Sequence, residues 1–370
     1  MNIKRLLAAL LTMTALTAAC EKNQYGPTGH IPGYGSGSED KESPTTKGEF
    51  AKGADISWVT EMEKDGVKFY DAAGKEAECT AVLKEAGFNS IRLRVWVNPE
   101  EGWCGAEDVL VKARRAKQQG MRLMIDFHYS DTWADPSNQN PPASWKDYNE
   151  SLMTTAITKH TSDILSRLKE EGIDVEWVQI GNEVNSGMLH PLGLVKDCST
   201  GSFITFLNAG YKTVKGIYPE AKVIAHISNG HEAGLSEWFF NLMKLGGATY
   251  DIIGLSLYPF WWENGGWNTW QTPAAACIEN IKSITKKYGK PVMLCESGAP
   301  VYYPDISKAY FTYILQETEK IDDCHGIFLW EPQTDGVWKP AGYASLGWNA
   351  YDKGAFKDGR PTAALDPFKE

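Results

Sequence analysis

The sequence predicts an α/β protein built as a single (β/α)8 TIM barrel. From Gly53 to the C-terminus at residue 370, short apolar runs alternate with longer segments of helical periodicity, which is typical of βα units around a parallel sheet. Eight such units in roughly 310 residues fit one barrel with insertions. The alternative is a doubly wound open sheet, which would need fewer units and usually has a glycine-rich phosphate-binding turn that we do not find.

The apolar runs define eight expected strands and the segments between them seven expected helices. The strands are Ala54–Trp58, Ser90–Val97, Met121–His128, the start of Glu176–Asn185, Lys222–Ile227, Asp251–Leu257, Pro291–Glu296 and Gly326–Trp330. The helices are Lys75–Ala86, Ala106–Gln119, Glu150–Glu171, Phe203–Tyr218, Leu235–Leu245, Pro273–Tyr288 and Ile306–Ile321. The first three helices each end before a glycine, a residue that commonly terminates helices. A final loop and a short helix close the chain.

Polar and aromatic residues gather where the expected strands end, and the strand starts show nothing comparable. Arg92 and Arg94 close the second strand, and Asp126 and His128 close the third. Barrel enzymes keep their active sites at the C-terminal ends of the strands, so this asymmetry predicts a site at that face. Arg92 and Arg94 share one strand face because side chains alternate along a strand. Arg94 is equally well explained as part of a structural ion pair.

Two glutamates stand out among these strand-end residues. Glu183 follows the fourth apolar run beside Asn182, and Glu296 interrupts the seventh. Two strand-end carboxylates favour glycoside hydrolysis, in which one donates a proton and the other attacks the sugar. A separation of about 5 Å would indicate retention and about 6.5–9.5 Å inversion, and the sequence leaves both open. Arg92 beside Glu296 would keep that carboxylate ionised. The structural alternative for Glu183 is an ion pair with an arginine.

Other strand-end and loop residues are candidate substrate contacts. They are Arg92, Asp126, His128, Trp133, Asn182, His226, Tyr258, Trp330 and Trp348. Aromatic rings of this kind stack on the apolar faces of sugars, although they are also common in cores and interfaces. Asp126 and His128 resemble half of a metal site, but no further ligand occurs at a suitable spacing. We therefore expect sugar-hydroxyl contacts there, and neither a metal nor a cofactor.

The N-terminal residues are typical of an exported protein. A basic start, an apolar run over Leu6–Leu16 and small residues before Cys20 predict a signal peptide over residues 1–19. Cys20 resembles the lipidated first residue of a bacterial lipoprotein, although Thr17 stands where such signals usually have Leu, which leaves ordinary cleavage as the alternative. Residues 20–52 are rich in Gly, Ser and Pro and are expected to form a flexible tether. The catalytic domain is expected over residues 53–370.

The net charge limits the classes of molecule that the protein can bind, and the cysteine count bears on its disulfide pairing. A formal net charge of −10 lacks the basic footprint of nucleic-acid binding and is compatible with neutral glycans. We expect a monomer attached to a membrane only through its lipid, on the outer membrane and at the cell surface rather than in the periplasm. Six cysteines follow Cys20 and allow fifteen full pairings, among which the sequence does not choose. Cys295 lies within a strand and is expected to be a small buried thiol.

Several strings resemble glycoside hydrolase family 53, from about Gly53 to the C-terminus. They are Arg-Val-Trp-Val-Asn-Pro (94–99), Asp-Phe-His-Tyr-Ser-Asp-Thr-Trp-Ala-Asp-Pro (126–136), Ile-Gly-Asn-Glu (180–183) and Trp-Glu-Pro (330–332). The resemblance implies an endo-β-1,4-galactanase with a (β/α)8 barrel and retention of anomeric configuration. It implies Glu183 as acid/base, Glu296 as nucleophile, and β-1,4-galactan or galacto-oligosaccharides as substrate.

Two departures and two alternatives accompany this resemblance. Ser297 follows the nucleophile where the family usually has Thr, and residues 301–307 lack the calcium-binding loop of some bacterial members. We therefore do not expect calcium, and the cysteine pattern gives no support for the loop disulfide of fungal relatives. One alternative function is a surface glycan-binding protein that no longer cuts. The other is a related barrel enzyme that acts on mannan, xylan or glucan.

Overall fold

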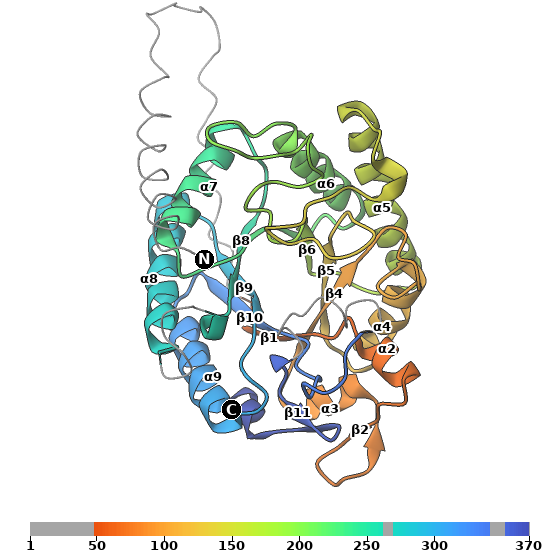
Figure 1. The fold of residues 1–370 in the computed structure, drawn as a ribbon, viewed down its shortest axis with the longest axis vertical. Helices are drawn as coiled ribbons and strands as arrows, with labels where there is room; N and C mark the ends of the chain where they lie inside the picture. The colour runs from red at the N-terminus through yellow and green to blue at the C-terminus, as the bar shows by residue number, and fades with distance from the viewer. Residues whose placement is uncertain (1–47, 262–268, 341–351, 370) are drawn as a thin grey trace, which may run out of the picture.

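The computed structural model describes residues 48–261, 269–340 and 352–369 and confirms the barrel. Eight parallel strands close in the order β1-β10-β9-β8-β7-β6-β5-β4, with helices around them (Figure 1). The strands are β1 (Ala51–Asp55), β4 (Ser90–Val95), β5 (Arg122–Phe127), β6 (Trp177–Ile180), β7 (Lys222–Ile227), β8 (Ile252–Leu257), β9 (Val292–Ser297) and β10 (Cys324–Trp330). Each expected strand therefore has a counterpart, and the open-sheet alternative is excluded.

The outer helices follow the strands in turn. They are α2 (Val59–Lys64), α3 (Cys79–Glu85), α4 (Ala106–Gln118), α5 (Glu150–Glu170), α6 (Phe203–Ile217), α7 (Ala233–Leu245), α8 (Gln271–Tyr288) and α9 (Pro304–Glu319). Short 3-10 turns are η1 (Ala143–Trp145), η2 (Pro259–Trp261) and η6 (Ala363–Phe368), and a small hairpin of β11 (Phe356–Lys357) and β12 (Arg360–Pro361) precedes η6. From α4 to α9, the helix bounds lie within two residues of those expected.

The first βα unit differs most from the expectation. Strand β1 begins at Ala51, three residues before the expected start, and includes Gly53. A larger side chain does not fit at Gly53, because a Cβ there would lie 2.1 Å from the ring of Phe328. A strand with Ala, Lys and Gly in these positions carries little apolar signal. The expected helix over Lys75–Ala86 is replaced at its start by an added hairpin, β2 (Phe69–Tyr70) and β3 (Glu76–Ala77).

The start of α3 is set by Glu78. Its side chain accepts a hydrogen bond from the Ala81 N–H, so the helix begins at Cys79 rather than Lys75. Before it, Asp71 accepts N–H groups from both Gly74 and Lys75, and Gly74 has a φ of 80°, which closes the turn of the hairpin.

The barrel interior changes from apolar to polar along its axis. Its lower part is filled by Ala51, Met124, Trp177, Ile224, Ile252, Met293, Cys295 and Phe328. Closer to the strand ends come buried polar side chains: Asp55, Arg92, Asp126, Gln179, His226 and Ser256. Charges in such a place are stable only when they are paired and hydrogen-bonded, so this polar layer must be a connected network.

A bulge in β9 aims Glu296 into the barrel. Leu255 of β8 pairs with Leu294, but the next residue, Ser256, pairs with Glu296, so Cys295 is the extra residue. Strict alternation would send Cys295 and Glu296 to opposite faces of the strand. With the bulge, Cys295 joins the interior apolar cluster and Glu296 still lines the site. Bulges beside active sites commonly redirect a side chain in this way.

Five of the cysteines in the described parts of the chain are buried and form no disulfide: Cys79, Cys104, Cys277, Cys295 and Cys324. Cys295 is thus a buried thiol, as expected. Over the same parts of the chain, no helix combines the length and apolar character needed to cross a membrane. Cys20 and Trp348 lie outside the described residues.

Candidate active site

A cavity of about 330 Å³ opens where the barrel strands end at their carboxyl side. Its lining residues come from the ends of β4, β5, β6, β8, β9 and β10 and the loops that follow: Arg92, Arg94, His128, Trp133, Ala134, Asp135, Pro136, Ser137, Asn182, Glu183, Tyr258, Glu296 and Trp330. Glu183 and Glu296 therefore face one shared space. This arrangement can accommodate a reacting group between two carboxylates.

Both carboxylate oxygens of Glu296 are held by donors. Nη2 of Arg92 lies 2.9 Å from Oε1, and the Tyr258 hydroxyl donates to Oε2 at 2.9 Å. Burial raises the pKa of Glu296 above its ordinary value, while Arg92 and Tyr258 act against that rise. Two charge-assisted contacts fix the orientation of this carboxylate and favour its ionised form.

Glu183 sits just past the end of β6 in a constrained backbone. Its φ is 45°, a left-handed conformation that costs a residue with a side chain roughly 1–2 kcal/mol. Gly181, with a φ of 83°, makes the turn, since a Cβ there would lie 2.5 Å from Cγ1 of Val184. The Val184 N–H donates to the His226 carbonyl at 2.8 Å and ties the turn to β7.

Glu183 keeps its proton at neutral pH, unlike an ordinary surface glutamate. Burial, with the negative charge of Glu296 as the next largest cause, raises the pKa of Glu183 to about 8. Loss of hydration is the larger of these two causes. Glu183 is therefore protonated at neutral pH, and a neutral acid faces a carboxylate that two donors hold.

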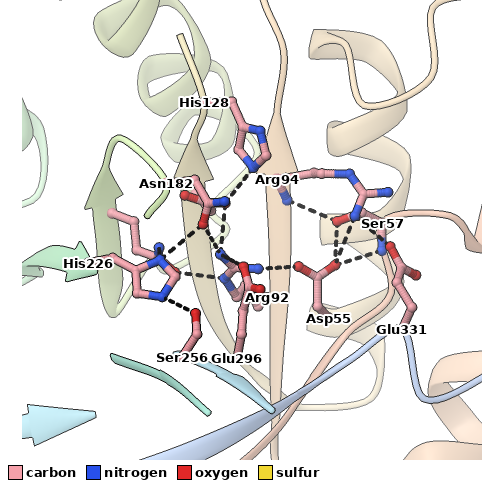
Figure 2. A network of polar contacts seen from close by, with 12 residues as sticks. Asp55, Ser57, Arg92, Arg94, His128, Asn182, His226, Ser256, Glu296 and Glu331 are labelled. Carbon is pink, nitrogen blue, oxygen red and sulfur yellow. Dashed lines mark hydrogen bonds and ion pairs between the residues drawn. The ribbon is translucent and has the colours of Figure 1, made fainter. Parts of the chain in front are cut away.

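Arg92 is the centre of the polar layer (Figure 2). It donates to Asp55 at 2.6 Å, to Asp126 at 2.9 Å, to Gln179 at 2.7 Å and to Asn182 at 3.0 Å, in addition to its contact with Glu296. Asp55 and Asp126 together supply the negative charge that allows a buried guanidinium. The predicted proximity of Arg92 and Glu296 is thus present, and one cation orients groups from four other strands.

Arg94 has both of the roles that the sequence left open. It forms an ion pair with Glu331, with Nη1 2.6 Å from Oε1, and it also lines the cavity. Its guanidinium lies 4.3 Å from the ring centroid of Trp133, with Trp58 and Trp96 slightly farther away. Burial raises the pKa of Glu331 to about 7, and Arg94 opposes that rise. The pair forms the charged base of an aromatic cluster at the cavity wall.

The nitrogen atoms of His128 are both engaged by the protein. Nε2 lies 2.9 Å from Asp126, and Nδ1 accepts the Ala134 N–H at 2.9 Å and the Trp96 indole N–H at 3.3 Å. Because Nδ1 accepts, the proton lies on Nε2 and points to Asp126. Within the described residues, no three His, Cys, Asp or Glu side chains are grouped as metal ligands would be.

The structure separates the expected substrate contacts into two sets. Arg92, His128, Trp133, Asn182, Tyr258 and Trp330 line the cavity. Asp126 and His226 are fully buried behind its wall, where they hold other side chains. Asp135, Pro136 and Ser137 of the cavity wall, and the supporting residues Asp55, Gln179, Ser256 and Glu331, were not among the candidates that the sequence indicated. Gln179 and Ser256 had a detectable signal, because each is a lone polar residue inside an apolar strand.

The chain matches one protein-family model and is similar to individual proteins from a fungus and a bacterium. Residues 51–368 match the family model described as glycosyl hydrolase family 53. The chain is 31% identical over 304 residues to arabinogalactan endo-beta-1,4-galactanase A from Aspergillus niger, covering 76% of this chain and 84% of the relative. It is 29% identical over 325 residues to the endo-beta-1,4-galactanase of Bacillus subtilis, covering 80% of this chain and 71% of the relative.

Solved structures show the same likeness in three dimensions. A structure reported among two fungal beta-1,4-galactanases superimposes with a TM-score of 0.76 at 28% identity, covering 86% of this chain and 98% of the other. The catalytic domain of a family 53 protein from Ignisphaera aggregans gives a TM-score of 0.75 at 26% identity, over 86% of this chain and 95% of the other. A family 10 endo-beta-1,4-xylanase, at 16% identity and a TM-score of 0.58, shares the fold alone.

Proposed function

This chain belongs to glycosyl hydrolase family 53, and on that premise we propose that it is a retaining endo-β-1,4-galactanase that cuts galactan or galacto-oligosaccharides. The chain is a glycoside hydrolase. The observation that carries the proposal is the pairing of a protonated Glu183 with a clamped Glu296 across one cavity. The galactanase relatives from a fungus and a bacterium support the choice of β-1,4-galactan.

We assign Glu296 as the nucleophile and Glu183 as the acid/base. In the first step Glu296 attacks the anomeric carbon while Glu183 gives its proton to the departing glycosidic oxygen. The C–O bond to the leaving sugar breaks as the bond to Glu296 forms. Arg92 and Tyr258 hold Glu296 with both oxygens oriented, so little reorientation of the nucleophile is needed at the moment of attack.

The second step uses the same residues in changed protonation states. Glu183, now ionised, takes a proton from the water that attacks the anomeric carbon, and the bond to Glu296 breaks. Once Glu296 is esterified its negative charge is gone, which removes one of the causes that raise the pKa of Glu183. The base form is therefore more accessible in the second step than in the first.

The cavity wall also suits a sugar ring. Trp133 and Trp330 line it with centroids 5.9 Å apart, and both pack against Trp58. Asn182 Nδ2 donates to the Ala134 carbonyl and its Oδ1 accepts from Arg92, so the amide is locked next to Glu183. We propose that Trp133, Trp330 and Asn182 orient the sugar that Glu296 attacks.

The proposal is tested by chromatography of products from a panel of β-1,4-linked galactan, mannan, xylan and glucan. Galactan is expected to be cut internally, and Glu183→Gln and Glu296→Gln are each expected to lower turnover by roughly a thousandfold or more. Glu176→Gln is the matched control, because Glu176 pairs with Arg122 at the opposite end of β6. Full activity in either active-site variant, or binding of galactan without cleavage by the wild type, would refute the assignment.

For the N-terminal segment we propose a lipoprotein form, with Cys20 lipidated and the residues from Cys20 up to the start of β1 at Ala51 as a tether that displays a monomeric enzyme at the cell surface. The basic and apolar leader followed by Cys20 supports this. Cys20→Ala is expected to move the full chain from the membrane fraction to the soluble fraction. Release of active enzyme by protease treatment of intact cells would favour surface display over a periplasmic location.

A further inference from the structure

Three buried carboxylates share one guanidinium next to the cavity. Nη1 of Arg92 lies 2.6 Å from Oδ2 of Asp55. Its Nη2 lies 2.9 Å from Oδ2 of Asp126 and 2.9 Å from Oε1 of Glu296. Asp55 and Asp126 are at most 1% exposed, so water does little to screen these charges. The group carries more negative than positive charge when its carboxyls are ionised.

Asp55 is held from the side away from Arg92 by the residues that follow β1. The Ser57 N–H and hydroxyl both donate to Oδ1 of Asp55, at 3.0 and 2.5 Å. The Ser57 hydroxyl oxygen accepts the Arg94 N–H at 3.0 Å, which leaves its hydrogen for Asp55. Lys112 of α4 donates to the Ser57 carbonyl at 2.7 Å. Figure 2 shows Asp55 between Arg92 and Ser57, with one oxygen for each.

Asp126 is held in a similar way by a neutral donor. Nε2 of His128 donates to Oδ2 of Asp126 at 2.9 Å, the same oxygen that accepts from Arg92. Although burial acts to raise it, Arg92 and His128 hold the pKa of Asp126 below its ordinary value, so this carboxyl is ionised at neutral pH. Neither aspartate is among the described residues that line the cavity, so neither touches the sugar.

Glu296 therefore faces only part of the positive charge of Arg92. A cation that paired with Glu296 alone would stabilise its carboxylate strongly, and a strongly stabilised ground state makes a weaker nucleophile. Burial raises the pKa of Glu296 and Arg92 lowers it, while the two aspartates raise it again. The transition state is oxocarbenium-like, so additional negative charge near it is also favourable. The other titratable groups that face Glu296 are the Tyr258 phenol and Glu183.

The aspartates have charged neighbours of their own. Nη1 of Arg94 lies 3.9 Å from Oδ1 of Asp55, and the same atom pairs with Glu331 at 2.6 Å. Because Glu331 already compensates Arg94, Arg92 remains the cation closest to Asp55. The titratable groups that face Asp126, apart from Arg92, are His128 and His226.

We propose that Asp55 and Asp126 are positioning residues that divide the charge of Arg92, so that Glu296 remains a strong nucleophile. The inference rests on the proposed role of Glu296. A purely structural role, in which the aspartates only hold Arg92 in place, predicts the opposite result. If they divide the charge, loss of one leaves more of it on Glu296 and favours the carboxylate. If they only hold Arg92, loss of one lets the guanidinium move away and disfavours the carboxylate.

The first test is the pH dependence of kcat/KM on galactan for Asp55→Asn. Asn keeps the shape of the side chain and removes its charge, so the acid limb is expected to move about one pH unit lower. We expect kcat to fall by about 10–100-fold with KM little changed, because Asp55 does not reach the sugar. An acid limb that is unchanged or moves to higher pH would overturn the proposal.

A second variant and a control accompany this test. Asp126→Asn removes the other aspartate charge and decides the question if Asp55→Asn does not fold; its acid limb is expected to move in the same direction. Asp251→Asn is the matched control, since Asp251 pairs with Lys215 at 2.8 Å just before β8, at the opposite end of the barrel. Its acid limb is expected to match the wild type. A shift in this control as large as in Asp55→Asn would also overturn the proposal.

The last test follows the ionisation of Glu296 without substrate. Carbon-13 NMR of labelled glutamate carboxyls records each titration, and the Glu296 signal is identified by its loss in Glu296→Gln. We expect Glu296 to titrate at lower pH in Asp55→Asn than in the wild type. Titration at the same or a higher pH would refute the division of charge even if Glu296→Gln were inactive. An active Glu296→Gln would instead refute the proposed function.

Discussion

Replacing Glu183 by Gln should stabilise the folded protein increasingly as the pH rises. The ordinary carboxyl value is 4.5, and in the folded protein the pKa of Glu183 is raised to about 8, chiefly by burial. Between these values the unfolded chain has lost this proton while the folded chain keeps it. The free energy of unfolding therefore falls with rising pH across this window, because ionisation favours the unfolded state. Gln is neutral and of similar shape, so it removes this dependence.

The size of the effect follows from the same two values. The rise in the pKa of Glu183 from 4.5 to about 8 corresponds to a loss of unfolding free energy on the order of 5 kcal/mol at high pH, because each pKa unit is worth about 1.36 kcal/mol. Glu183 is only partly buried, and screening by solvent reduces the penalty. We therefore expect a gain of roughly 2–4 kcal/mol for Glu183→Gln near pH 8, and a gain close to zero near pH 4.5.

Urea unfolding followed by tryptophan fluorescence measures this difference. Wild type and Glu183→Gln are compared at about pH 5 and about pH 8, with the denaturant slope checked for equality between them. Other raised carboxyls, such as Glu296 and Glu331, occur in both proteins, so their contributions largely cancel. A stability difference that is the same at both pH values would show that Glu183 titrates normally, and the account of its acid role would be wrong.

Three further predictions concern catalysis and folding. The rate should fall as the pH rises through about 8, because Glu183 must carry a proton; a pH–rate profile that stays flat across this value would contradict the assignment. Tyr258→Phe removes the donor to Oε2 of Glu296, so the acid limb should move to higher pH and kcat/KM should fall by about 10–100-fold, measured in the same profiles. Gly53→Ala should destabilise the barrel by about 1–3 kcal/mol in thermal or urea unfolding, because its Cβ meets the Phe328 ring, whereas Gly216→Ala, with open space in α6, should be neutral or stabilising.

The sequence by itself predicted the barrel and the positions of its two key carboxylates. Apolar runs and helical periodicity located every barrel strand to within a few residues, and the bounds of β7 were predicted without error. Glu183 and Glu296 were recognisable because a lone charge at the end of an apolar strand is costly unless it has a partner or a function. Both signals depend only on residues close together in the chain, so they can be recognised in the sequence without the structure.

Local patterns failed where the decisive contact was distant in the chain. Strand β1 was placed three residues late because Gly53 is required by Phe328, which lies on β10. The added hairpin before α3 depends on a turn around Asp71 that the helical pattern of the flanking residues obscures.

Only the tertiary structure decided how the site is built. The bulge at Cys295 turns Glu296 inward, although strict alternation along β9 would have pointed it away. The surroundings of Glu183, Arg94 and His226 come from strands far apart in sequence, and so do the shifts in their protonation. Whether a carboxyl is an acid or a nucleophile depends on which donors and charges the closed barrel brings within a few ångströms of it. The order of residues along one strand does not contain that information.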